Sequence, residues 1–258
     1  MRRKTGYGAA VLGLAIILAM SSGCGKKENK YSYRTAGIKA LNAGNYDAAI
    51  EAFDQAVNSS KGLVGKFDVD VLKYRAEAEY LSGDYQSAVN TYDILIQVDG
   101  ERAEYLNMRA VSKAGAGDSN GALEDYKRSA SLDPDKQAPG RTKALLAAGA
   151  AMEKTGTASE AMTLYEAALK EGEQSAELFN RMGLCRMAEE DWDGAIGYFK
   201  KGLTAEDGSK VPELLFNQAV AQEYKGDFKT ALDLMQQYVT AHGSDEEAER
   251  EITFLKTR

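Results

Sequence analysis

The side chains able to perform covalent or acid–base chemistry are few in this sequence. It holds two cysteines, Cys24 and Cys185, and one histidine, His242. A catalytic thiol needs a general base within hydrogen-bond reach, and His242 is expected in a loop flanked by glycine. Cys185 lies among apolar residues of an expected helix, which indicates a small buried hydrophobic side chain. A thiol-dependent enzyme is therefore disfavoured.

Metal and cofactor chemistry finds no better support. The sequence has no Walker loop, no dinucleotide-binding glycine fingerprint and no nucleophile elbow. One histidine and one free cysteine exclude a zinc site made of these residue types. Carboxylate pairs such as Glu189-Glu190 and Glu246-Glu247 fall at expected helix ends, where a solvated surface is the simpler interpretation. The sequence predicts no catalytic residue, no metal and no cofactor.

The first 23 residues have the organisation of a targeting segment. Arg2, Arg3 and Lys4 are followed by an apolar run from Ala9 to Met20. That run is shorter than the roughly 20 residues of a membrane-spanning helix, and it suits the apolar region of a signal peptide. Small residues precede Cys24.

A cysteine directly after an apolar region and small residues resembles the lipobox of bacterial lipoproteins. The resemblance implies cleavage before Cys24, a diacylglycerol on its sulfur, and residues 24–30 as a tether. The expected location is then the extracytoplasmic side of the cell membrane or envelope. An ordinary secreted protein with an incidental cysteine and an uncleaved short anchor remain the alternatives.

The charge of the chain argues against nucleic-acid binding. The net charge is −7 over 258 residues. Residues 1–23 hold three basic residues and no acid, so the remainder carries −10. Binding to phosphates needs clustered positive charge, which the rest of the chain lacks apart from Lys26-Lys27.

A repeated pattern organises the rest of the sequence. A glycine-acid-aromatic group, followed by a small residue and then a large aromatic one, recurs from positions 44, 83, 117, 156, 190 and 226, with local departures. In the first copy an apolar face with helical spacing follows: Tyr46, Ala49, Ile50, Phe53, Ala56 and Val57. The glycine suits a turn between two helices, because glycine readily adopts left-handed geometry. Each copy therefore predicts two helices joined by a tight turn.

The spacing of 34 to 39 residues and the small and aromatic positions resemble the tetratricopeptide repeat. We expect an all-α superhelix of about six such repeats over residues 31–243, at 31–62, 69–102, 103–136, 142–175, 176–209 and 212–243. A small residue should let paired helices approach at 49, 88, 122, 161, 195 and 231. The spacing of Ser244 and Glu247 is that of a capping box, which predicts a polar-faced capping helix over 244–258.

The resemblance implies that the first helix of each repeat lines a concave surface where a peptide docks. Aligning the repeats places eight candidate binding residues there. They are Arg34, Lys73, Tyr74, Asn107, Asn180, Arg181, Asn217 and Tyr224.

The expected function is that of a membrane-anchored scaffold for a protein or peptide partner in an envelope assembly. A binding protein for a soluble secreted peptide or a cell-wall fragment is the alternative. Insertions at 58–70 and 134–141 lie between repeats on one edge. Whether they contact a partner or act as spacers is open at this stage.

Overall fold

A computed structural model describes residues 29–60, 64–156 and 158–258 of the chain. The expected signal peptide, the lipidation site Cys24 and Gly62 of the first insertion lie outside the described residues.

The described residues form thirteen α-helices and one short 3₁₀ turn, Gly208–Lys210, without a strand. None of these helices is long and apolar enough to cross a membrane. The predicted all-α solenoid is confirmed. The helices are α1 (Lys30–Asn42), α2 (Tyr46–Asn58), α3 (Lys66–Ser82), α4 (Tyr85–Asp99), α5 (Ala103–Gly115), α6 (Ser119–Leu132), α7 (Arg141–Lys154), α8 (Ala158–Lys170), α9 (Ala176–Ala188), α10 (Trp192–Thr204), α11 (Glu213–Lys225), α12 (Phe228–His242) and α13 (Glu246–Leu255).

The turn inside each repeat follows from two adjacent residues. The glycine before the second helix adopts a positive φ, as at Gly83 (85°) and Gly226 (89°). The next residue then caps the helix: Asp84 Oδ1 accepts the backbone N–H of Ser87 at 3.1 Å. Such a cap satisfies one of the free N–H groups at a helix N-terminus. The fifth repeat is an exception, because Glu190 takes the left-handed position with a φ of 59°.

Small residues bring the two helices of a repeat into close contact. All six predicted alanines of the second helices are fully buried. In three repeats the first helix carries a glycine, and the aromatic ring of the same repeat's second helix lies against it. These pairs are Gly37 with Phe53, Gly149 with Tyr165 and Gly183 with Phe199. Phe53 also stacks on Tyr74 of the next repeat, with ring centroids 5.9 Å apart.

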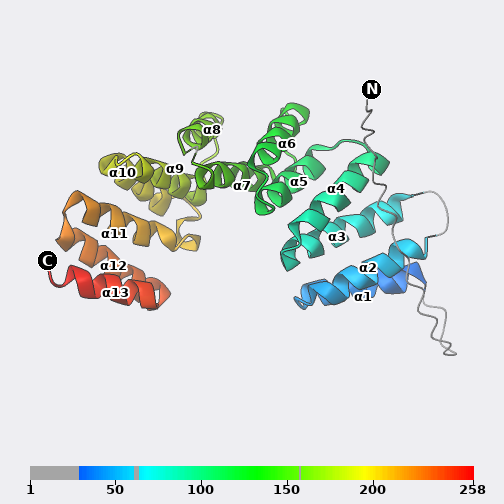
Figure 1. Ribbon diagram of the computed structural model, residues 1–258, viewed down its shortest axis with the longest axis horizontal. Helices are drawn as coiled ribbons and strands as arrows, with labels where there is room; N and C mark the ends of the chain where they lie inside the picture. The colour runs from blue at the N-terminus through cyan, green and yellow to red at the C-terminus, as the bar shows by residue number, and fades with distance from the viewer. Residues whose placement is uncertain (1–28, 61–63, 157) are drawn as a thin grey trace, which may run out of the picture.

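The repeats build an arch (Figure 1). In its middle part α6, α8 and α10 lie on the outer side, whereas α5, α7 and α9 lie toward the inner side. The core is a series of five local clusters along the chain instead of one centre. This arrangement is expected of a solenoid, in which each repeat contacts only its neighbours.

The second insertion changes the packing between repeats three and four. α7 packs against α5 as extensively as against α6, so two first helices are in direct contact. The connecting segment is fixed by polar contacts. Asp133 Oδ2 accepts the N–H of Ala138 at 2.8 Å, and Asn107 Nδ2 donates to the carbonyl oxygen of Pro139 at 2.9 Å.

The C-terminal helix α13 covers the last repeat. Leu255 is 3% exposed and belongs to the same cluster as Met235. The capping box was predicted at Ser244, but the capping residue is Asp245, whose Oδ1 accepts the N–H of Ala248 at 2.8 Å. Ser244 donates its hydroxyl to Glu249 instead. The carboxylate holds the cap because it is the stronger acceptor toward backbone N–H groups.

Candidate functional site

An apolar cavity of about 490 Å³ lies over the first helices α3, α5 and α7. Four tyrosines line it, together with Leu81, Met108 and Pro139. Pro139 comes from the second insertion, so the first helices and this insertion together form one pocket. The tyrosines are Tyr74, Tyr80, Tyr92 and Tyr105. Throughout, this cavity is called the tyrosine pocket.

Charged side chains at the tyrosine pocket are held over its rings. Lys73 Nζ lies 3.1 Å from Glu104 Oε1 and 5.7 Å from the ring centroid of Tyr105. Lys143 Nζ lies 4.3 Å from the ring centroid of Tyr80. A cation over an aromatic face is attracted by the negative face of the ring. The rim therefore offers both signs of charge around an aromatic floor.

The phenol groups of Tyr92 and Tyr105 stay protonated at neutral pH. Burial and the neighbouring charge of Glu77 raise the pKa of Tyr92. Burial and the hydrogen bond to Asp99 raise the pKa of Tyr105, whose hydroxyl lies 2.6 Å from the Asp99 carboxylate. These groups are suited to packing and hydrogen bonding, which are the usual roles of tyrosine at interfaces.

Three of the predicted binding residues come together here. Lys73 and Tyr74 line the tyrosine pocket. Arg34 lies beside it, with its guanidinium 5.3 Å from the ring centroid of Tyr74 and its Nε 2.5 Å from Asp70. Their part in binding remains a prediction.

Three others form a separate polar cluster on α9 and α11. Asn217 Nδ2 donates to Oδ1 of Asn180 at 2.9 Å. Arg181 pairs with Glu177 at 2.8 Å and Glu153 at 3.5 Å. Asn180 is only 4% exposed. Since these groups bond to one another, their first role is to join repeats four, five and six.

Asn107 and Tyr224 belong to neither group. Asn107 is fully buried, and its amide nitrogen is used by Pro139, so it supports the insertion and is not free to bond a peptide. Tyr224 is 64% exposed and stacks on Trp192 with centroids 4.9 Å apart. The ring of Tyr224 therefore lies against α10.

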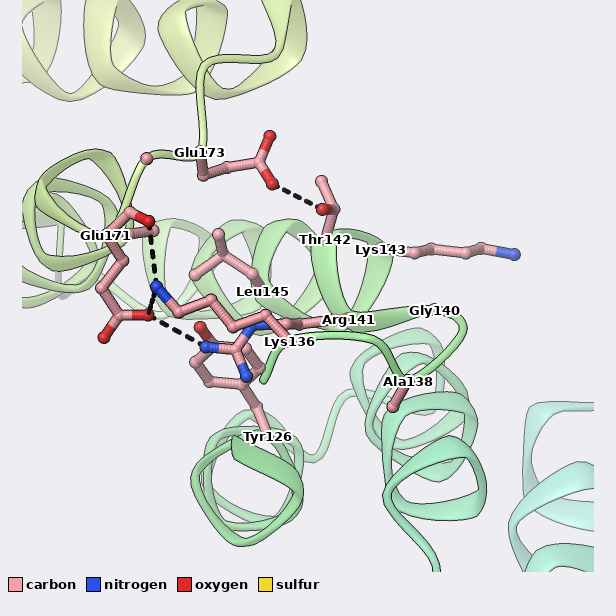
Figure 2. A pocket seen from close by; sticks show the side chains of 12 residues that line it. Tyr126, Lys136, Ala138, Gly140, Arg141, Thr142, Lys143, Leu145, Glu171 and Glu173 are labelled. Carbon is pink, nitrogen blue, oxygen red and sulfur yellow. Dashed lines mark hydrogen bonds and ion pairs between the residues drawn. The ribbon is translucent and has the colours of Figure 1, made fainter. Parts of the chain in front are cut away.

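A second cavity, of about 350 Å³, lies where the insertion meets the turn after α8 (Figure 2). Lys136 and Arg141 both bind the carboxylate of Glu171, at 3.3 and 2.9 Å. Thr142 donates to Glu173 at 2.6 Å. Lys143 extends away from these groups in Figure 2, in agreement with its contact to Tyr80. The charges in this cavity neutralise one another. The ion pairs of Lys136 and Arg141 with Glu171 therefore hold the insertion and α7 against the turn after α8.

Reactive groups in the described part of the chain are held in inert surroundings. Cys185 is 1% exposed, and burial together with Glu153 raises the pKa of its thiol to about 12. Its predicted burial is confirmed. Glu79 is 2% exposed and bonded by Thr91 at 2.6 Å and Arg75 at 3.2 Å. No group of three or more potential metal ligands occurs among the described residues.

Tyr80, Tyr92 and Tyr105 are not among the residues predicted to bind a partner. Alignment by repeat position selects one face of each first helix, whereas the pocket also draws on α4 and on an insertion. One feature of the sequence does indicate this region. Five of the 14 tyrosines in the sequence lie between positions 74 and 105, and tyrosine is enriched in binding hot spots.

Comparison with known proteins agrees with the fold. The tetratricopeptide-repeat family matches residues 34–103 and 213–244. A tetratricopeptide-repeat protein from Parabacteroides merdae superposes with a TM-score of 0.67 at 15% identity, over 88% of this chain and 86% of that one. No curated protein sequence matches the chain.

Two further solved structures share the fold. PilW, described as a widely conserved type IV pilus biogenesis factor, has a TM-score of 0.65 at 17% identity, over 88% of this chain and 98% of its own. YrrB, described as having an unusual peptide-binding site, has a TM-score of 0.52 at 14% identity, over 78% and 93%. With the repeats described above, these matches show that the chain has the fold of tetratricopeptide-repeat proteins, and the family models match two segments of it.

Proposed function

We propose that this protein is a membrane-anchored, extracytoplasmic scaffold that binds a protein or peptide partner of an envelope-associated assembly. The observation that carries the proposal is the tyrosine pocket, an aromatic cavity on the concave side with charges of both signs at its rim. Aromatic anchors in a partly enclosed site contribute most of the free energy at many protein interfaces.

The geometry favours a segment with an apolar side chain flanked by polar groups. Tyr74, Tyr80 and Leu81 present apolar surface, and Leu81 is 44% exposed. Lys73 and Glu104 at the rim are more than one quarter exposed and can bond to a peptide backbone or to charged side chains. YrrB, described as having a peptide-binding site, and PilW, described as a type IV pilus biogenesis factor, have the same fold and are consistent with this proposal.

The anchor is supported by the sequence alone. The basic start, the apolar run and Cys24 follow the order of a lipoprotein signal peptide. Only four residues separate Cys24 from Asn29, which caps α1. The solenoid is therefore proposed to begin close to the membrane.

The test is Leu81→Glu in the full chain, with Leu132→Glu as the matched control. Leu81 and Leu132 are 44% and 39% exposed, and only Leu81 lines the tyrosine pocket. The proposal predicts that a stoichiometric partner co-purified from solubilised membranes is lost with Leu81→Glu and kept with Leu132→Glu. Equal recovery with both variants would contradict it. Recovery of a soluble peptide or cell-wall fragment in place of a membrane protein would favour the alternative function.

A further inference from the structure

One edge of the first two repeats exposes apolar and basic side chains beside the start of α1. Tyr31 is 61% exposed and Val64 is 51% exposed. Lys30 and Lys66 lie next to them in the chain, and neither forms an ion pair among the described residues. Figure 1 shows the start of α1, the end of α2 and the start of α3 together at the right of the view.

Packing holds these groups in one surface. The rings of Tyr31 and Phe67 meet edge to face at 4.9 Å, and Lys30 Nζ lies 4.4 Å from the centroid of Phe67. Val64 and Lys66 line the same shallow cavity as Val98 and Arg102. We define the N-terminal edge as Lys30, Tyr31, Val64, Lys66, Val98 and Arg102.

The acids at this edge are already paired. Asp99 binds Arg102 at 2.7 Å and Glu101 binds Arg128 at 2.5 Å. Asp68 forms no ion pair in the described part of the chain, but it is 5% exposed, and its Oδ2 accepts the N–H of Gly65 at 2.9 Å. Against the effect of burial, its hydrogen bonds and the charge of Lys30 lower the pKa of its carboxyl. Among the described residues of this edge, the exposed charges outside ion pairs are therefore the two lysines, which suit an anionic surface.

From these features we infer that the N-terminal edge rests on the lipid bilayer and contacts its headgroup region. The inference depends on the proposed lipid anchor. The five residue-to-residue steps from Cys24 to Asn29 span at most about 18 Å, so a lipidated Cys24 keeps this edge within reach of the headgroups. Tyrosine and lysine are favoured there, because one part of each side chain is apolar and the other polar.

This placement has a consequence for the tyrosine pocket. In this placement the starts of α1, α3 and α5 and the ends of α2 and α4 face the bilayer. The concave surface is then exposed parallel to the membrane plane. Asp70, Lys73 and Glu104 of the tyrosine pocket lie in the first two turns of α3 and α5 and also line the shallow cavity at this edge. A partner is then captured close to the membrane surface.

The chain contains a residue that serves as a control for contact with lipid. The single tryptophan, Trp192, begins α10 and stacks on Tyr224 near the end of α11. These helix ends belong to the opposite edge, where the turns inside the repeats lie. Trp192 should therefore remain away from lipid when Tyr31 touches it.

The experiment uses the full chain purified from membranes and reconstituted into phosphatidylglycerol–phosphatidylethanolamine vesicles with brominated acyl chains. Quenching of Trp192 in the parent is compared with quenching in the variant Tyr31→Trp, Trp192→Tyr. The variant should lose about half of its emission, as expected for a residue at the headgroup boundary, while the parent loses almost none. Circular dichroism confirms that the variant is folded.

A charge reversal sharpens the test. Lys30→Glu with Lys66→Glu in the quenching variant should reduce the loss of emission, whereas Lys154→Glu with Lys229→Glu at the opposite edge should not. A chain that floats with the vesicles without quenching at position 31 would overturn this inference and leave the anchor standing. A chain that does not float with the vesicles would overturn both.

Discussion

The ring of Phe53 occupies the space that a side chain on Gly37 would need, since a Cβ atom on Gly37 would lie 2.5 Å from Cε1 of the ring. The same relation joins Gly183 to Phe199. The first and second helices of a repeat approach closely because one supplies no side chain where the other supplies an aromatic ring. This contact sets the geometry on which the concave surface depends.

Gly183→Ala should therefore destabilise the protein by about 1–3 kcal/mol through overpacking. Gly197→Ala on α10 is the matched control, because nothing lies within 4 Å of a Cβ atom there. Alanine at 197 should stabilise by up to about 1 kcal/mol through helix propensity. Urea unfolding measures both changes. Equal effects of the two substitutions would mean that the ring does not lie against Gly183.

Glu190→Gly should stabilise the fifth repeat. Glu190 has a φ of 59°, a conformation that costs a residue with a side chain about 1 kcal/mol or more. The substitution restores the glycine that most other repeats carry at this turn. Thermal unfolding should show that the free energy of unfolding rises by about 1 kcal/mol. The rise is reduced by the entropy that the more flexible glycine backbone loses on folding. Gly226→Ala, at a φ of 89°, should produce a loss of similar size. A fall in melting temperature with Glu190→Gly would contradict this interpretation.

The capping helix should be pH-sensitive. Burial, together with the hydrogen bond and charge of Glu251, raises the pKa of Glu223 from 4.5 to about 7, against the opposing charge of Arg258. Between these two values the folded state holds a proton that the unfolded state releases, so stability falls as the pH rises through this window. Glu223→Gln removes the effect.

The melting temperature of Glu223→Gln should exceed that of the parent at pH 8 by about 2 °C. The difference should shrink as the pH is lowered to 5. Glu246→Gln, an exposed acid on α13, the helix that carries Glu251, serves as the control. A pH-independent difference between Glu223→Gln and the parent would rule out this carboxyl pair as the cause.

Cys24→Ala should give a folded protein that is no longer anchored. Cys24 supplies the proposed lipid, and the helices described here begin at Lys30. Cell fractionation with a probe for the chain measures the result. If the variant stays in the membrane fraction and keeps its first residues, the segment is an uncleaved anchor instead of a lipoprotein signal.

The repeated spacing of small and aromatic residues was sufficient to predict the all-α solenoid, because these positions pack within a repeat and leave a local periodic signal. The roles of the polar residues were harder to predict. Asn107 bonds to Pro139, 32 residues away, and Asn217 bonds to Asn180, 37 residues away. Such pairs depend on how repeats stack, and periodicity within one helix does not reveal them.

The tyrosine pocket could not be predicted from the sequence for the same reason. Its wall combines first helices with Tyr92 of α4 and with Pro139 of an insertion. The sequence identified Lys73 and Tyr74 from their repeat positions. It did not reveal that the second insertion folds back onto α5 and completes the cavity.

The central claim is that the tyrosine pocket holds the partner. Its most direct test places a photoreactive p-benzoylphenylalanine at position 81 and, separately, at position 132 of the full chain in intact cells. Both positions are partly exposed, and only position 81 lines the pocket. Irradiation should link one defined envelope protein or peptide to position 81 and not to position 132. Linkage of the same partner from position 132 alone would show that binding occurs elsewhere on the solenoid.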